Sequence, residues 1–440
     1  MKNINTDFYF DLCKIYKYTS IVYPKFNERK TAFENIFSTS LKQLNKIKTD
    51  KDYFILLSKL FASLNDGHTY ITMPQSLRKE LGYLPFDFIC INNEYYIKSA
   101  TSEFKELVLK QIKSINGVEF NSLLKECFKY IHHNENFTYW NKIEQILPLL
   151  LKQRNNKITT TDYKNYKFNL NAQPQEKVGF STIKSSFKYK EIVNNDYSLF
   201  EFENDIIYLK LDSFNNSNLI NNCVKELKKL KKAKAIIIDV RNNEGGITKN
   251  AEKIAELFFN KPFSDSIKLT TQTNGLDLAS ASQYACFSEE KLNEFITNGI
   301  TTKEIIEKNL KTYNGETFKE YSSTWGSNKK AVFTSPCYIL TSRYTISAAE
   351  DFVAMFKSNN RASIIGDNTY GSTGTPFMLK LSNGFNAKIC SVHYTLLDKT
   401  EFINIGIKPD IKKCLTINDL RTGKDTVLDY AIKYINNLKD

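Results

Sequence analysis

The second half of the chain alternates two kinds of segment, and this alternation constrains the fold more than any other feature. The segments DIIYLKLDSF and KAIIIDV are nearly continuous apolar runs, as buried strands are. The segments NLINNCVKELKKLKKA and KNAEKIAELFF repeat apolar residues every three or four positions, as amphipathic helices do. This pattern predicts a largely parallel sheet with helices on both faces. Residues 196–440 are therefore expected to form an α/β unit, with a polar helical segment inserted at about 275–330.

The first half of the chain is organised differently, and 440 residues are too many for one ordinary domain. Residues 1–78 show helical periodicity up to the segment LNDGHTYITMP, where Pro74 forbids continuation of a helix. Residues 79–135 contain short strands, with a tight turn predicted at Asn116-Gly117. Residues 136–195 are typical of a connector made of a helix and a hairpin.

Composition and charge exclude several classes of protein. The chain is 41% hydrophobic and 25% charged, which is ordinary for a globular protein. The net charge of +13 is spread along the chain, mostly as lysine, and the lack of clustering argues against a nucleic-acid partner. The eight cysteines show no Cys-x-x-Cys spacing, so neither disulfides nor a metal or other cofactor is expected.

Targeting signals are also missing from the sequence as written. No stretch reaches the roughly 18 apolar residues that a membrane helix needs, so no membrane span is expected. The segment MKNINTDFYFDLCKIYKY lacks the apolar run and small-residue cleavage site of a signal peptide. A cytoplasmic location is therefore expected, while the oligomeric state cannot be read from the sequence.

A serine at a predicted helix start is the first candidate for chemistry. In CYILTSRYTISAAEDFVAMF a strand runs into a polar turn, and a helix follows Ser347. A hydroxyl at such a place lies beside free backbone N–H groups and the positive end of the helix dipole, which suits a nucleophile whose oxyanion needs donors. The same pattern, Ser347 with Glu350 three residues later, is also a capping box without any chemistry.

A histidine in a glycine-marked turn is the second candidate. Serine becomes a good nucleophile when a base removes its proton, and histidine is the side chain best suited to this near neutrality. Of the four histidines, His68 lies in the turn LNDGHTYI between a helix and a strand. The pair His132-His133 is expected at the surface, and His393 is expected in the core or at a sheet edge.

The segment AIIIDVRNNEGGI is the third candidate. A buried strand ends at Asp239, and the loop that follows lies where open α/β sheets bind their ligands. The paired glycines Gly245 and Gly246 allow backbone N–H groups to approach a substrate closely. Asp239 and Arg241 can brace this loop as an ion pair. The alternatives are a plain strand-to-helix turn and a phosphate cradle, and the second is disfavoured because the segment has neither the P-loop lysine pattern nor Gly-x-Gly-x-x-Gly.

Taken together and in this order, the three segments resemble the serine peptidases that comprise the tail-specific (carboxy-terminal processing) proteases and the core of tricorn protease. IIGDNTYGSTG is similar to the family's Ile-Gly-x-x-Thr-Tyr-Gly segment, and GIKPDI to its closing Gly-Ile-x-Pro-Asp. The resemblance covers essentially the whole chain. It implies a crotonase/ClpP-like β-α spiral peptidase core in the α/β unit and a degenerate PDZ-like module at residues 79–135, where KQIKSINGVEF resembles a PDZ turn.

The resemblance also implies roles for individual residues. Ser347 matches the nucleophile and His68 the general base of the histidine-using, tricorn-like branch, while Ala348 and either Gly245 or Gly246 match the oxyanion donors. Tail-specific proteases carry a base lysine where this chain has Ser372, so a serine–lysine dyad is not expected.

The group that orients His68 is left open by the sequence. Relatives tend to carry a glutamate where this chain has Ile403. Glu401, two residues earlier, and Glu350, next to the nucleophile, are the two candidates.

The implied activity is serine-type hydrolysis of peptide bonds, in peptides, unfolded proteins or protein C-termini, without a cofactor. Non-proteolytic relatives exist, such as the vertebrate retinoid-binding protein of the photoreceptor matrix, and a fold does not determine function. The alternative is therefore a non-catalytic protein that binds peptides or small apolar ligands on the same scaffold.

Overall fold

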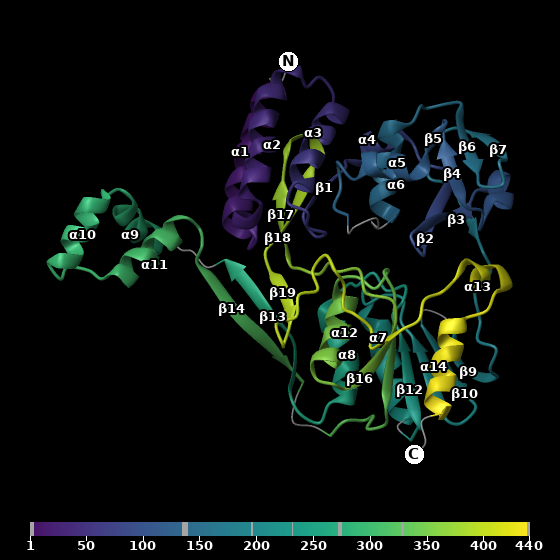
Figure 1. Ribbon diagram of the computed structural model, residues 1–440. Coiled ribbons are helices and arrows are strands. Elements are labelled where there is room, and N and C mark those ends of the chain that lie inside the picture. The colour runs from purple at the N-terminus through teal and green to yellow at the C-terminus, as the bar shows by residue number, and fades with distance from the viewer. Residues whose placement is uncertain are drawn as a thin grey trace.

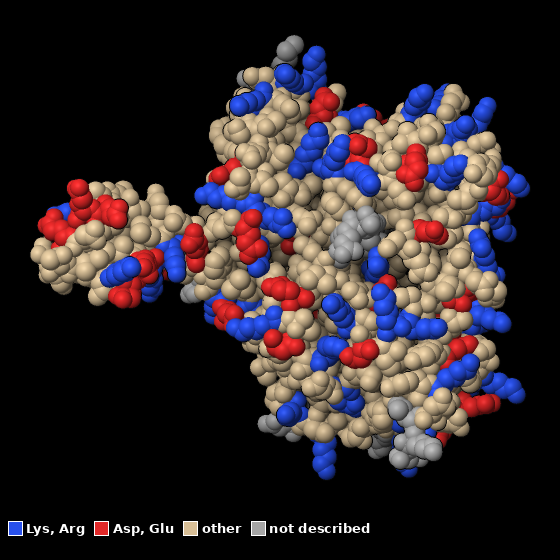
Figure 2. All heavy atoms as spheres, in the orientation of Figure 1, with Lys and Arg blue, Asp and Glu red and all other residues tan. Residues whose placement is uncertain are grey.

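The computed structural model describes residues 4–133, 140–194, 197–230, 232–271, 275–326 and 330–437. Figure 1 shows a helical N-terminal region beside a strand-rich module, both above an α/β unit, with a helical arm that projects from the body. Figure 2 shows lysine and arginine side chains scattered over the visible face, in line with the dispersed charge of the sequence. Within the described residues no helix has the length and apolar character that a membrane crossing requires.

The N-terminal region is helical, as predicted, and it is joined to the other end of the chain by a small sheet. Its core includes the stacked rings of Phe8 and Tyr53, whose centroids are 3.7 Å apart. The sheet has the order β1-β18-β17, and antiparallel pairing of β1 with β18 sets Tyr70 opposite Lys388. The elements are α1 (Ile4–Val22), α2 (Phe26–Gln43), α3 (Asp50–Ala62), β1 (Tyr70–Thr72), β17 (Pro376–Lys380) and β18 (Asn386–Cys390).

The strand-rich module reaches further along the chain than residues 79–135. Strands β6, β7 and β8 belong to the segment expected as a connector, yet they complete the two sheets β5-β4-β6-β7 and β2-β3-β8. The tight turn predicted at Asn116-Gly117 is confirmed, with both residues at positive φ between β4 and β5. That the module is PDZ-like stays a prediction. Its elements are α4 (Gln75–Leu81), β2 (Phe86–Ile91), β3 (Glu94–Ala100), β4 (Ile112–Ile115), β5 (Val118–Glu119), α5 (Phe120–Cys127), α6 (Trp140–Leu150), β6 (Asn156–Thr160), β7 (Asn165–Phe168) and β8 (Val178–Gly179).

The α/β unit contains the predicted sheet, with strand order β20-β16-β15-β12-β11-β10-β9. The strands from β11 to β20 are parallel, and β10 and β9 are antiparallel additions at one edge. Helices cover both faces, since Ile236 and Ile238 pack in the same core as α7, α8 and α12, whereas Ile237 packs with α14. The strands are β9 (Tyr189–Asn194), β10 (Ser198–Phe202), β11 (Ile206–Lys210), β12 (Ala235–Asp239), β15 (Cys337–Thr341), β16 (Ala362–Gly366) and β20 (Ile411–Lys412). The helices are α7 (Ser217–Leu227), α8 (Thr248–Ala255), α12 (Ala348–Ser358), α13 (Ile417–Thr422) and α14 (Thr426–Asn437).

The inserted segment forms an arm and does not lie over the carboxyl ends of the parallel strands. Figure 1 shows its helices at the far end of the β13–β14 ribbon, away from the body. Ile300 is 66% exposed and Tyr313 is 51% exposed, so these helices bury little apolar surface. The elements of the ribbon and the arm are β13 (Phe263–Thr271), α9 (Gly275–Ala285), α10 (Glu289–Thr297), α11 (Lys303–Tyr313) and β14 (Phe318–Trp325), and the later strand β19 (His393–Leu396) pairs with β13.

A buried charge network fixes the loop that follows β12. The predicted ion pair between Arg241 and Asp239 is present, at 2.5 Å, and Arg241 also bonds bidentately to Asp425 at 2.8 and 2.6 Å. Asp425 in addition accepts the Leu428 N–H at the start of α14. The C-terminal helix and the loop after β12 are therefore tied to one guanidinium.

We expect the substitution Asp425→Ala to destabilise the protein strongly, because it leaves a buried guanidinium with one partner and removes a helix cap. The expected loss is about 3 kcal/mol in the free energy of unfolding, measured by denaturant titration. The matched control is Asp212→Ala, which breaks the exposed ion pair with Lys210 and should cost less than about 1 kcal/mol. Similar small losses in both variants would contradict this role for the network.

Candidate active site

Ser347 lies in the loop after β15, directly before α12, in a strained backbone conformation. Its φ of 58° is positive, which is costly for a residue with a side chain. The side chain makes no capping hydrogen bond to α12, so the capping box that the sequence also allowed is not formed. The hydroxyl of Ser347 is thus not used to cap the helix.

His68 reaches Ser347 from the turn between α3 and β1. Its Nε2 lies 3.2 Å from Ser347 Oγ, across 279 residues of sequence. The turn is held by Asp66, whose side chain accepts the backbone N–H of His68 at 2.9 Å. The pairing of β1 with β18 then fixes this turn against the α/β unit.

The environment of His68 keeps its imidazole neutral. Burial, together with the positive charges of Lys142 and Lys388, lowers the pKa of His68 to about 3. A neutral imidazole is the form that can accept a proton from a hydroxyl. The second ring nitrogen, Nδ1, lies 2.6 Å from Ser372 Oγ.

The two glutamates considered as orienting groups both lie elsewhere. Glu350 is fully buried and accepts hydrogen bonds from Thr369 Oγ1 at 2.5 Å and from the backbone N–H groups of Gly371 and Ser372, each at 2.7 Å. Burial raises the pKa of Glu350 to about 7, and these three hydrogen bonds oppose the rise. Glu401 instead bonds to Nε2 of His393 at 2.8 Å.

One expectation about the other histidines is wrong. His132 was expected at the surface, but it is only 4% exposed, and its Nε2 bonds to Asn404 Oδ1 at 2.7 Å. Its partners come from loops of the α/β unit more than 200 residues away along the chain, as the separation of 272 residues from Asn404 shows. Polar local sequence suggested exposure, but these distant partners satisfy the ring nitrogens and allow burial.

Of the paired glycines, Gly245 approaches the nucleophile closely, whereas Gly246 lies against Phe214 and Asn215. Gly245 has a φ of 95°, and a Cβ added there would lie 2.8 Å from Ser347 Cβ and 2.9 Å from Ala348 N. The Gly245 N–H already donates to Asn243 Oδ1 at 2.8 Å. In the described part of the chain, the N–H groups of Gly246 and Ala348 have no acceptor. Gly246 with Ala348 is therefore the better candidate pair of oxyanion donors. The missing side chain of Gly245 leaves room for Ser347 and for the backbone of Ala348.

A large cleft lies between the strand-rich module and the α/β unit. It measures about 830 Å³ and is lined by residues from the module, such as Cys90 in β2, and by Arg343 and Tyr344 from the loop that leads to Ser347. The hydroxyl of Tyr344 accepts the Cys90 N–H at 3.1 Å and so joins the two walls. Ser347 and His68 do not themselves line this cleft, whose nearest lining residue along the chain is Tyr344, three residues before Ser347.

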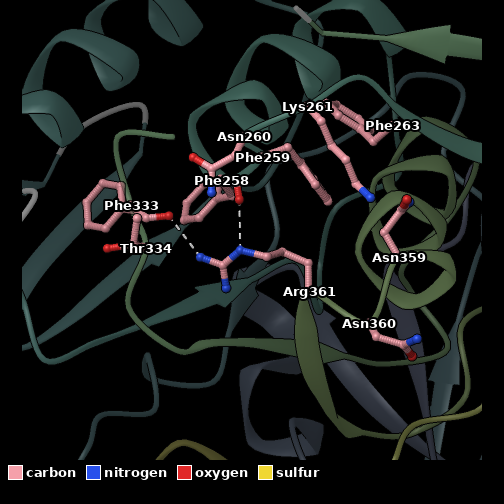
Figure 3. A pocket seen from close by; sticks show the side chains of 10 residues that line it. All are labelled: Phe258, Phe259, Asn260, Lys261, Phe263, Phe333, Thr334, Asn359, Asn360 and Arg361. Atoms are coloured by element: carbon pink, nitrogen blue, oxygen red, sulfur yellow. Dashed lines mark hydrogen bonds between the residues drawn. The ribbon is translucent and has the colours of Figure 1, made fainter. Parts of the chain in front are cut away.

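A second hollow, of about 490 Å³, has no part in this chemistry. Figure 3 shows that Arg361, its one guanidinium, points to main-chain carbonyls, and its hydrogen bonds reach Phe258 O at 2.8 Å and Phe333 O at 2.9 Å. No residue that lines this hollow belongs to the Ser347 site. Its polar groups hold loops together.

Sequence comparison finds a peptidase family and curated proteins that are similar to parts of this chain. Residues 205–413 match the model of peptidase family S41, a range that includes Ser347 and the glycine loop but not His68. A protein of Chlamydia trachomatis serovar D is 33% identical over 110 residues, which is 24% of this chain and 18% of that protein. A protein of Chlamydia muridarum is 32% identical over 92 residues, 20% of this chain and 15% of that protein. The matched segments thus span less than a fifth of these relatives.

Solved structures extend the similarity of fold over nearly the whole chain. Mature CPAF has a TM-score of 0.69 at 14% identity, and mature CPAF complexed with lactacystin one of 0.70 at 13% identity, each with 99% of both chains covered. The photosystem II D1 C-terminal processing protease has a TM-score of 0.50 at 14% identity, with 97% of this chain and 99% of that chain covered. The greater part of the α/β unit is thus similar to peptidase family S41, and the chain as a whole shares its fold with mature CPAF and with the C-terminal processing protease.

Proposed function

We propose that this chain is a serine peptidase that hydrolyses peptide bonds through an acyl-enzyme on Ser347, with His68 as the general base. The observation that carries the proposal is the 3.2 Å separation of His68 Nε2 from Ser347 Oγ, with a neutral imidazole on one side and a strained serine on the other. The similarity of residues 205–413 to peptidase family S41 and the N–H groups of Ala348 and Gly246, which have no acceptor among the described residues, support it.

The reaction follows from these positions. As Ser347 Oγ attacks the carbonyl carbon of the substrate, its proton passes to His68 Nε2, and the carbonyl electron pair moves onto oxygen. The N–H groups of Gly246 and Ala348 stabilise this oxyanion. Nε2 then gives its proton to the leaving amine as the C–N bond breaks, and water repeats the sequence to release the acyl group.

We propose that the cleft between the strand-rich module and the α/β unit holds part of the substrate. Its walls come from the strand-rich module and the α/β unit. They enclose a volume of about 830 Å³ and present backbone, aromatic and charged groups to it. The solved relative named a C-terminal processing protease acts, by that name, at a chain end. We therefore propose peptides, unfolded chains or protein C-termini as substrates of this protein.

We expect the substitution Ser347→Ala to lower the rate of peptide hydrolysis by a factor of about 10³ or more, since the covalent step is lost. The measurement is turnover of a mixed fluorogenic peptide library, together with labelling by a fluorophosphonate probe, which the variant should lose. The control is Ser335→Ala at the other end of β15, where Oγ only donates to the Ala233 carbonyl. Labelling that persists in Ser347→Ala would reassign the nucleophile, and a wild type that neither turns over peptides nor takes the label would favour a binding protein.

We expect kcat/KM to stay nearly constant as the pH falls, well below the usual histidine value of 6.5, because His68 has its pKa lowered to about 3. Removal of a nearby positive charge by Lys388→Gln should raise this pKa and move the acid limb of the profile upward. Circular dichroism at each pH separates loss of activity from loss of fold. An acid limb near pH 6.5 that does not move in the Lys388 variant would contradict His68 as the buried base.

A further inference from the structure

The nitrogen of His68 that faces away from the nucleophile has an unexpected partner. In the described part of the chain, the ring of His68 bonds only to two hydroxyls, Ser347 Oγ through Nε2 and Ser372 Oγ through Nδ1, the latter at 2.6 Å. No carboxylate of the described residues bonds to either nitrogen. Ser372 itself is 3% exposed, so water does not compete freely for this bond.

Ser372 is held in place through its main chain from two directions. Its N–H donates to Glu350 Oε2 at 2.7 Å, and its carbonyl accepts the N–H of Ser347 at 3.0 Å. Glu350 lies in the first turn of α12, the helix that Ser347 precedes. The hydroxyl of Ser372 is thus fixed relative to the nucleophile and not only relative to His68.

The glycine before His68 gives a second, independent indication. A Cβ at Gly67 would come well inside contact distance of Ser372 Oγ. The φ of Gly67 is not in the left-handed region, so its backbone does not itself require glycine. The space that the absent side chain leaves is filled by the Ser372 hydroxyl on its way to His68.

We propose that Ser372 is the positioning residue of His68, so that Ser372, His68 and Ser347 form one hydrogen-bonded chain, with Glu350 holding Ser372 through the main chain. The inference rests on the proposed function. For Nε2 to accept the proton of Ser347, Nδ1 must carry the other hydrogen and donate it to Ser372 Oγ. When Nε2 has taken that proton, both ring nitrogens carry hydrogen, and Ser372 Oγ remains the acceptor on the Nδ1 side.

A hydroxyl in this position has a consequence that a carboxylate would not have. A carboxylate at Nδ1 stabilises the imidazolium through its full charge, whereas a hydroxyl offers only a dipole. The charged groups around the ring do not replace that carboxylate. Lys142 and Lys388 are positive, and the carboxylate of Asp66 accepts the backbone N–H of His68. The remaining titratable neighbour, His132, lies near Gly67 and is buried. The relay therefore works with a weakly basic imidazole whose orientation and tautomer depend on Ser372.

The first test compares Ser372→Ala with the control Ser335→Ala. We expect Ser372→Ala to lower kcat by about 10- to 100-fold with little change in KM, because the imidazole loses its orientation but the cleft is unchanged. Gly67→Ala should show a similar loss, and the double variant should be no worse than the poorer single one, since both act through one hydroxyl. Activity of Ser372→Ala within twofold of wild type would overturn the inference. If Ser347→Ala is inactive in the same assay, the proposed function stands, but Ser372 is not the residue that positions His68.

The second test asks for an effect that a merely structural role of Ser372 would not produce. We expect Ser372→Asp to move the acid limb of kcat/KM upward by about one pH unit or more, because a carboxylate then faces Nδ1. In the inactive Ser347→Ala background, nitrogen chemical shifts of the His68 ring should show hydrogen on Nδ1, and further replacement of Ser372 by alanine should shift the tautomer ratio. This readout needs no turnover and applies even if the aspartate variant does not fold. An unchanged tautomer ratio would overturn the inference.

Discussion

The antiparallel pairing of β1 with β18 is the interaction on which the site depends. β1 follows His68 by one residue, and β18 belongs to the last quarter of the chain. Through this short sheet the helical N-terminal region is held against the α/β unit, so an imidazole and a hydroxyl 279 residues apart come within 3.2 Å. Without it the two halves of the candidate relay would belong to separate parts of the molecule.

The loops at the carboxyl ends of the parallel strands are held by buried polar groups rather than by apolar packing alone. Arg241 joins the loop after β12 to the C-terminal helix through Asp239 and Asp425. Glu350 holds the loop that contains Ser372 by accepting hydrogen bonds from its backbone N–H groups. Each charged group has several partners, as burial requires. This rigidity lets Ser347 keep a positive φ that a mobile loop would relax.

Local patterns predicted the parts of the site that depend on neighbours in sequence. Ser347, His68 and the glycine loop each lie in a turn that the sequence predicts, and Ser347 comes together with both His68 and Gly245. Glu401 was considered for its spacing along a strand, but the turn between β19 and Glu401 directs it to His393. The sequence marks Ser372 only as the position where tail-specific proteases carry a lysine, because nothing near a serine in the sequence shows which distant ring it contacts.

The sequence by itself determined the alternation of strands and helices, the parallel sheet and the turns that carry Ser347 and His68, because these follow from side-chain periodicity and from glycine and proline preferences over a few residues. Only the tertiary structure decided which group orients His68, which of Gly245 and Gly246 keeps a donor without an acceptor, and that His132 is buried. Those outcomes depend on hydrogen-bond partners that the chain supplies from hundreds of residues away, and a polar side chain has no local signature for a partner at that distance.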